Sequence, residues 1–295
     1  MKLTTTRVSA LCLGVAALCG SGLPASAISF TQPGGTMGSA LGTASPTGLY
    51  FNNYANYGIA NDTAINRTQE IGFEQPGFLW SSGYKFLGAT YSASVYGVFE
   101  DIGTHGTSYL RGVFNPEITP IALSWDLGNN IFVSFQENVY LPVTSEVANV
   151  GAGFEQVISI SYTGNDWVLS ANNIFGIGTS DGGLKEPDYY NLDLTVAHNF
   201  GPWQLGAVGY GSFDLETTAL NTAALGGRGT ALGLGGLLGY TFSNNIAISL
   251  MATHQVVTHG VTEYLKDDTR VWTSLTIPIW TPPAAPTPKP VVAKY

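Results

Sequence analysis

Four histidines are the residues best suited to acid–base or metal chemistry. His105, His198, His254 and His259 are scattered, and none forms the helical His/Glu spacing of a zinc site. A membrane-barrel lipase needs a Ser, a His and a polar orienting group at one rim. His254 could act as such a base, but no Ser-centred motif lies beside it, and an interfacial His is the simpler interpretation. The sequence therefore predicts no enzyme, no metal site and no cofactor.

Two other patterns suggest binding at first sight. Gly233–Gly239 is as glycine-rich as a phosphate loop, but it lies within a predicted strand with no helix after it. Small residues where the wall packs closely are the better explanation. The pairs Glu100-Asp101 and Asp267-Asp268 are interpreted as solvated loop acids.

The side chains that could line a solute path follow from strand alternation. In Tyr189–Phe200 one face carries Leu192, Leu194 and Val196, and the other carries Asn191, Asp193 and Thr195. Such a segment has one apolar face and one wet face, as in a membrane barrel with lipid outside and water inside. The same reasoning predicts these lumen residues: Lys85, Gln136, Asn138, Asn191, Asp193 and Gln255.

Asp193 is the most informative of these residues. An acid beside amides would favour cations and repel carboxylate substrates. If Lys85 meets Asp193 across a narrow barrel, the pair would constrict the lumen instead.

Composition supports the barrel and excludes several other classes. Only 11% of the 295 residues are charged, against about 25% in soluble domains. No stretch beyond the leader has 18 consecutive apolar residues, so no transmembrane helix is expected. A soluble β-sandwich also alternates, but its strands run about five or six residues. The predicted strands here are about twice as long, enough to cross a bilayer.

The chain divides into four regions. Residues 1–27 resemble a secretory signal, with Lys2 and Arg7 before an apolar run and Ala25-Ser26-Ala27 at the cleavage site. Cys12 and Cys19 lie in this signal without the preceding small residue of a lipoprotein, so the mature chain has no cysteine. We expect an irregular segment at 28–46, on the periplasmic side or partly inside the barrel, an outer-membrane barrel at 47–280 and a Pro-rich periplasmic tail at 281–295.

Loss of the signal changes the charge balance. Removing Lys2 and Arg7 leaves nine basic residues against twenty acidic ones, a net charge of −11. This disfavours nucleic acid as a partner, because no basic patch is available for phosphates. The expected partners are the lipid bilayer and a small-molecule solute.

Twelve alternating segments predict an all-β, antiparallel, up-and-down transmembrane barrel. Their predicted ranges are Gly48–Gly58, Gly77–Phe86, Leu87–Phe99, Pro116–Leu127, Asn130–Leu141, Gly151–Tyr162, Trp167–Ile177, Tyr189–Phe200, Trp203–Phe213, Gly229–Phe242, Asn245–Val256 and Arg270–Trp280. Tight turns rich in Gly, Asn and Asp alternate with longer connections. Outer-membrane barrels have short periplasmic turns and long outer loops, so both ends of this barrel are expected in the periplasm, with the chain a monomer. Pro278 in the last strand leaves open where the barrel seam closes.

Aromatic side chains gather at the strand ends next to the short turns. This is the position of an interfacial girdle in membrane barrels. The predicted girdle residues are Trp80, Tyr84, Phe86, Trp125, Tyr162, Trp167, Phe200, Trp203, Tyr240 and Phe242.

The block 112–125 resembles a feature of one group of Gram-negative outer-membrane proteins, the "MetA-pathway of phenol degradation" family, also called SphA-like. A Pro-x3-Pro-x2-Leu-x-Trp pattern is matched by Pro116, Pro120, Leu123 and Trp125, although Phe114-Asn115 replaces the usual Gly-Asp. Similar short motifs are Pro46-x-Gly48-x-Tyr50 and Gly236–Tyr240, and the likeness covers roughly residues 46–280. The resemblance implies a channel for small hydrophobic or aromatic compounds.

The function expected from these observations is passive uptake of small, poorly water-soluble molecules through the outer membrane. Tyr96, Leu237 and Met251 on the inner face would suit amphipathic solutes. Two alternatives stay open: a general small-pore porin for ions and small polar solutes, and a structural or adhesive barrel with a closed lumen.

Overall fold

A computed structural model describes residues 29–62, 67–105, 108–148, 151–177, 180–181, 184–185, 187–218, 228–259 and 265–283. The predicted signal and most of the Pro-rich tail lie outside these residues. The strands are β1 (Gly48–Asp62), β2 (Arg67–Phe86), β3 (Ala89–Thr104), β4 (Ser108–Asp126), β5 (Ile131–Tyr140), β6 (Gly153–Gly164), β7 (Trp167–Ile177), β8 (Ser180–Asp181), β9 (Leu184–Lys185), β10 (Tyr189–Phe200), β11 (Trp203–Asp214), β12 (Thr230–Thr241), β13 (Ala247–His259) and β14 (Leu265–Trp280).

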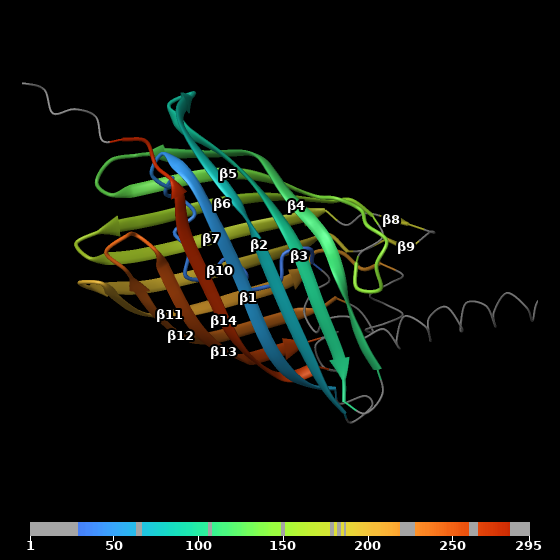
Figure 1. Ribbon diagram of the computed structural model, residues 1–295. Coiled ribbons are helices and arrows are strands. Elements are labelled where there is room, and N and C mark those ends of the chain that lie inside the picture. Colours follow the sequence, from blue (N-terminus) through green and yellow to red (C-terminus); the bar gives the residue numbers. More distant parts are fainter. Residues whose placement is uncertain are drawn as a thin grey trace, which may run out of the picture.

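Twelve of these strands form one closed antiparallel barrel, which confirms the predicted fold (Figure 1). Each strand pairs with its neighbours in the chain, and β14 pairs with β1 to close the ring. The strands β8 and β9 form a separate two-stranded sheet. Pro278 is accommodated at the seam, where it lies opposite Tyr50 next to a register shift. A closed ring satisfies the backbone hydrogen bonds of every strand, which a lipid environment requires.

The short connections have the backbone that tight hairpins need. In the β6–β7 turn Asn165 and Asp166 have φ of 52° and 63°, as expected for a two-residue turn with both central residues left-handed. Gly201 (φ 62°) is followed by Pro202, whose fixed φ suits the second turn position. The turns β2–β3, β4–β5 and β12–β13 lie at the same end of the barrel, which we call the short-turn end. The opposite end is the long-loop end.

The longest strands differ from the prediction. Residues 59–76 and 100–115, expected to be loops, belong mostly to β1, β2, β3 and β4. These strands extend past the others at the long-loop end (Figure 1). Their sequences lack the lipid-facing pattern there, for example Glu74-Gln75 and Glu100-Asp101, but their ladders continue by cross-strand pairing. Alternation of apolar residues therefore marks the membrane-spanning part of a strand and not its full length.

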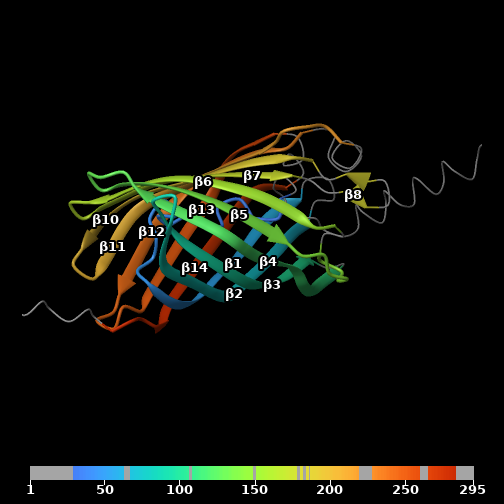
Figure 2. The same cartoon turned by 90° about the horizontal axis from the view of Figure 1, so that it is seen from above.

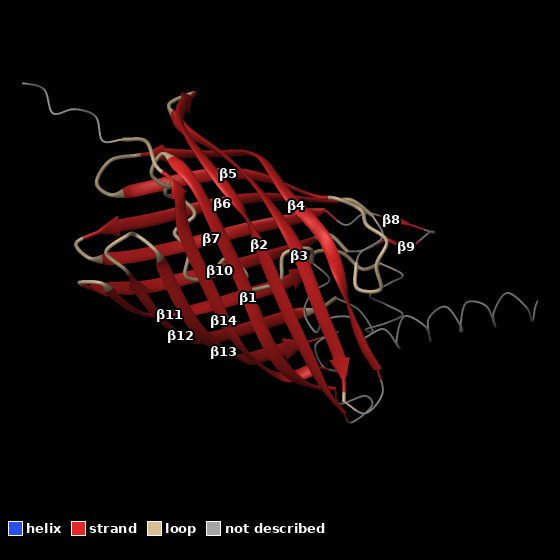
Figure 3. Ribbon diagram, in the orientation of Figure 1, coloured by secondary structure: helices blue, strands red, loops and turns tan. Residues whose placement is uncertain are grey.

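The outer surface is apolar and the inner surface mostly polar. Leu192, Leu194 and Val196 of β10 face outward, whereas Asn191, Asp193 and Thr195 are buried inside. At the short-turn end, aromatic side chains contact one another across strands, as in the pairs Trp80–Tyr91 and Trp203–Tyr240. In Figure 3 the described residues form strands and loops only, and among them no helix is long and apolar enough to span a membrane.

Inward tyrosines lie across glycines of the neighbouring strand. Tyr96, Tyr189 and Tyr210 are paired in register with Gly77, Gly176 and Gly233. A Cβ atom at Gly233 would collide with the Tyr210 ring, so only glycine lets the ring lie against the wall. Close packing is thus the reason for glycine at Gly233 and Gly235 in β12, whereas a Cβ at Gly236 would have space.

The lipid-facing assignment of β10 gives a direct test. Leu194→Arg places a charge at mid-strand on the outer face, where Leu194 is 43% exposed, and should destabilise the inserted barrel by about 2–4 kcal/mol. Unfolding by urea in lipid vesicles measures this. The matched control is Leu127→Arg in the β4–β5 turn, with an expected cost of about 0–1 kcal/mol. Equal losses in both variants would contradict the facing of this strand.

Candidate functional site: a lumen narrowed by the N-terminal segment

The segment before the first strand, residues 29–47, runs lengthwise through the barrel lumen (Figures 1 and 2, blue). At the long-loop end the Phe30 ring stacks on Tyr140 at 5.0 Å between centroids. At the short-turn end Gly42 accepts a hydrogen bond from Ser124 Oγ (2.6 Å), and its N–H donates to Ser161 Oγ (3.1 Å). We had expected this segment on the periplasmic side or partly inside the barrel, and it lies inside.

Two kinds of local structure let this irregular chain occupy the lumen. Successive turns are closed by hydrogen bonds such as Gly35 N–H to Gln32 O and Thr43 N–H to Ala40 O. Gly34 has φ of 92°, a left-handed conformation that glycine adopts without steric cost. Backbone groups that the turns leave free are then available to the barrel wall.

Asp193 is the principal anchor of the segment. One carboxylate oxygen accepts the Gly34 N–H at 2.9 Å, and the other accepts the Thr36 N–H at 2.8 Å and the Thr36 Oγ1 hydroxyl at 2.7 Å. The neighbouring inward residue of β10, Thr195, accepts the Gly38 N–H at 2.8 Å. Three donors to a carboxylate compensate for its removal from water.

A second anchor lies nearer the long-loop end. Glu155 of β6 accepts the N–H and the hydroxyl of Thr31 at 2.9 and 2.7 Å. The hydroxyl groups of Tyr140 and Tyr189 also hydrogen-bond to Glu155. Asn191 adds a hydrogen bond from its Nδ2 to Thr31 O at 3.1 Å. Glu155 is thus fully occupied by donors and fixes the start of the described segment.

A third set of contacts to the N-terminal segment involves a buried ion pair. Arg270 pairs with Asp268 at 2.8 Å, and its guanidinium also donates to Gln32 Oε1 at 3.1 Å. Gln32 in turn donates to Glu100 Oε1 at 3.3 Å. Glu100 and Asp268, interpreted from the sequence as solvated loop acids, are 5% and 3% exposed and face inward. The interpretation was wrong because β3 and β14 continue beyond the apolar pattern, so these residues keep the inward side of a strand.

Apolar contacts hold the segment against one half of the barrel. Met37 is buried in a cluster with Tyr210, Leu237, Met251 and Trp272, on strands β11 to β14. Leu237 and Met251 were expected on the inner face and lie there. This side of the lumen is therefore packed, and any open space must lie along the other strands.

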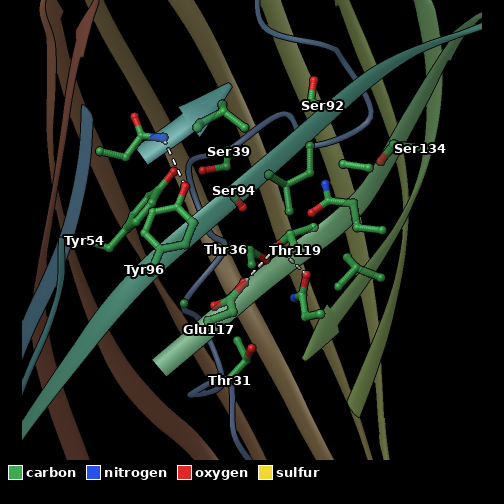
Figure 4. A pocket seen from close by; sticks show the side chains of 18 of the residues that line it. Thr31, Thr36, Ser39, Tyr54, Ser92, Ser94, Tyr96, Glu117, Thr119 and Ser134 are labelled. Carbon is green, nitrogen blue, oxygen red and sulfur yellow. Dashed lines mark hydrogen bonds between the residues drawn. The ribbon is translucent and has the colours of Figure 1, made fainter. Parts of the chain in front are cut away.

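That space is a cavity of about 400 Å³ between the segment and the wall formed mainly by β1 to β7. Phe73, Leu79 and Val98 supply apolar walls, and the rings of Tyr54 and Tyr96 meet edge to face at 6.4 Å between centroids. Figure 4 shows these tyrosines beside Ser94, with Glu117 and Thr119 on the neighbouring strand. The volume falls in the range of small-molecule sites.

The predicted lumen residues separate into four groups. Gln136 and Asn138 line the cavity, whereas Asn191 and Asp193 bind the N-terminal segment. Gln255 of β13 is buried, with 6% of its surface exposed. Lys85 is exposed at the end of β2, where it pairs in register with Thr90. Thr90 lines the cavity and paired residues share one face of a sheet, so Lys85 keeps the inward side of the ladder but lies at its exposed end.

Asp193 and Lys85 do not meet, because the N-terminal segment occupies the Asp193 carboxylate. The sequence reasoning missed Glu117 and Glu155 as inner residues. Both lie on strands whose outward residues alternate, and that signal could have found them. His254, for which an interfacial position is the simpler interpretation of the sequence, is exposed, and its Nδ1 hydrogen-bonds to Thr269 Oγ1 at 2.8 Å. Among the described residues no cluster of His, Cys, Asp and Glu could hold a metal.

The girdle residues lie at the short-turn end as a group. Trp80, Trp167, Phe200, Trp203 and Phe242 are among the exposed large side chains. Tyr84 and Phe86 are exposed as well, and Trp125, Tyr162 and Tyr240 are half-buried. Their role at a membrane interface remains a prediction.

The anchoring by Asp193 gives a test of how the segment narrows the lumen. In Asp193→Asn the side-chain NH2 group replaces one carboxylate oxygen and cannot accept a hydrogen bond from the segment. Each hydrogen bond to the charged carboxylate that is lost should weaken the binding of the segment to the wall by roughly 1.5–3 kcal/mol. We expect the barrel to fold normally and its single-channel conductance in planar bilayers to rise. Glu137→Gln is the control, because Glu137 contacts Gln156 on the outer face. Unchanged conductance in Asp193→Asn would show that this carboxylate does not hold the segment in place.

Comparison with known proteins agrees with the architecture. A solved outer-membrane channel from Pseudomonas putida F1 is similar with a TM-score of 0.64 and 12% identity, covering 79% of this chain and 96% of that one. The translocator domain of the autotransporter NalP from Neisseria meningitidis is less similar, with a TM-score of 0.46 and 10% identity over 79% of this chain and 88% of that one. No protein of curated function matches the sequence. The family model described as "Putative MetA-pathway of phenol degradation" matches residues 52–267, and the chain belongs to this family.

Proposed function

We propose that this outer-membrane barrel mediates passive, non-enzymatic uptake of small hydrophobic or aromatic compounds. The observation that supports this most directly is the cavity beside the N-terminal segment, with the aromatic and aliphatic side chains of Phe73, Leu79, Tyr54 and Tyr96 in its wall. A poorly water-soluble molecule would exchange outer-membrane lipid for these surfaces. The family description and the barrel likeness agree with such a role.

A general porin for ions or sugars is the first alternative. It needs an open polar lumen, whereas residues 29–47 fill the side of this lumen against β10 to β14. A structural barrel with a closed lumen is the second alternative. It would need no cavity with polar and aromatic walls, and it predicts no solute flux.

We also propose that the short-turn end faces the periplasm and that the barrel acts as a monomer. Removing the predicted signal removes both cysteines, so single cysteines can be labelled without background. On intact cells a membrane-impermeant maleimide should label Thr144→Cys, in the β5–β6 connection, and should not label Asn129→Cys, in the β4–β5 turn; both positions are exposed. The reverse labelling would overturn the orientation.

Uptake can be tested with a variant that fills the cavity. Ser94 lines the cavity, and the adjacent Val95 is 49% exposed on the outer face. In porin-deficient cells the native barrel should accelerate entry of labelled naphthalene but not of arabinose. Ser94→Trp should remove this acceleration, and Val95→Trp should retain it. Faster arabinose entry would favour the general porin, and no flux of either compound would favour the closed barrel.

A further inference from the structure

Among the described residues, Glu117 is the one carboxylate that lines the cavity. It lies on β4, is 8% exposed and lines the cavity. Asp193 and Glu155 are used by the N-terminal segment, and Asp268 pairs with Arg270. Among the described residues, Glu117 has no cationic partner: its contacts are Gln75, Thr119 and Tyr140.

The available protons do not satisfy both oxygens of Glu117. Its Oε2 accepts Gln75 Nε2 at 2.6 Å and faces the Tyr140 hydroxyl at 3.2 Å. Its Oε1 faces only the Thr119 hydroxyl, at 3.3 Å. That hydroxyl has a single proton and a closer acceptor, Asn138 Oδ1 at 2.9 Å. Glu117 Oε1 is therefore short of a donor, and the space beside it is the cavity.

A second buried acceptor on the same cavity is also free. Asn52 is 4% exposed and lines the cavity, and its Oδ1 has no hydrogen-bond partner. Its Nδ2 donates a hydrogen bond to the Tyr96 hydroxyl at 3.2 Å. The rings of Tyr96 and Tyr54 provide the nearby surfaces (Figure 4).

We propose that the cavity binds an amphipathic solute with a protonated amine, and that Glu117 is the counter-charge for this group. An ammonium group supplies several N–H donors for acceptors such as Glu117 Oε1 and Asn52 Oδ1. Tyrosine faces attract a cation, and a carboxylate in a partly dehydrated site favours one strongly. The cavity of about 400 Å³ leaves room for an apolar body against Phe73 and Leu79, which an inorganic cation would not use.

This inference rests on the proposed function, and equilibrium binding tests it separately from transport. Three probes share one apolar body: phenethylammonium, neutral 2-phenylethanol and phenylacetate. With the purified barrel in detergent, calorimetry should show phenethylammonium binding about tenfold or more tightly than the alcohol, with phenylacetate weakest. Glu117→Gln keeps the side-chain shape and should reduce the ammonium affinity to that of the alcohol, leaving the alcohol unchanged.

The control is Glu137→Gln on the neighbouring strand, which removes the same charge from the outer face and should leave all three affinities unchanged. Equal ammonium affinity in the native barrel and Glu117→Gln would overturn the amine site. Displacement of phenethylammonium by equimolar K⁺ would assign the site to inorganic cations and would also overturn it. If 2-phenylethanol binds as tightly as phenethylammonium, only this inference fails and the proposed function stands. If no probe binds, the cavity is not a solute site and the proposed function loses its support.

Discussion

Backbone hydrogen bonding without water is the constraint on which the rest of this structure depends. In hydrocarbon, unpaired N–H and C=O groups cost several kcal/mol each, and a closed ladder of strands leaves none at an edge. Pairing of β14 with β1 closes the ladder here. In the closed ring each strand turns one face to lipid and the other to the lumen, and successive residues alternate between the two faces.

The interior contains carboxylates in a space that lipid surrounds. Each needs hydrogen-bond donors or a cation, because an uncompensated buried charge is costly. The N-terminal segment donates hydrogen bonds from backbone N–H groups and hydroxyls to Asp193 and Glu155, and Arg270 forms an ion pair with Asp268. The segment is thus held mainly by acceptors on the wall, and in being held it narrows the lumen.

The distribution of contacts is uneven around the barrel, and this asymmetry leaves the cavity. Met37 packs against Tyr210 and Trp272 on one side. On the other side Tyr54, Tyr96 and Glu117 face open volume. A solute on this path would contact aromatic surface and a donor-poor carboxylate together, which distinguishes the path from the water-filled pore of a general porin.

The sequence by itself determined the parts that depend on local periodicity. Alternation in Tyr189–Phe200 assigned Asp193 to the inside, and Asn-Asp and Gly-Pro turns predicted the hairpins, because side-chain direction in a strand has a period of two residues. Tertiary structure decided what this periodicity cannot encode. Lys85 lies at the exposed end of its strand, and continued pairing beyond the apolar pattern kept Glu100 inside. The N-terminal segment has no periodic pattern, and its contact from Gly34 to Asp193 spans 159 residues. Only the closed barrel brings these residues together. It shows that the Asp193 carboxylate, predicted to line an open path, instead holds the segment that narrows the lumen.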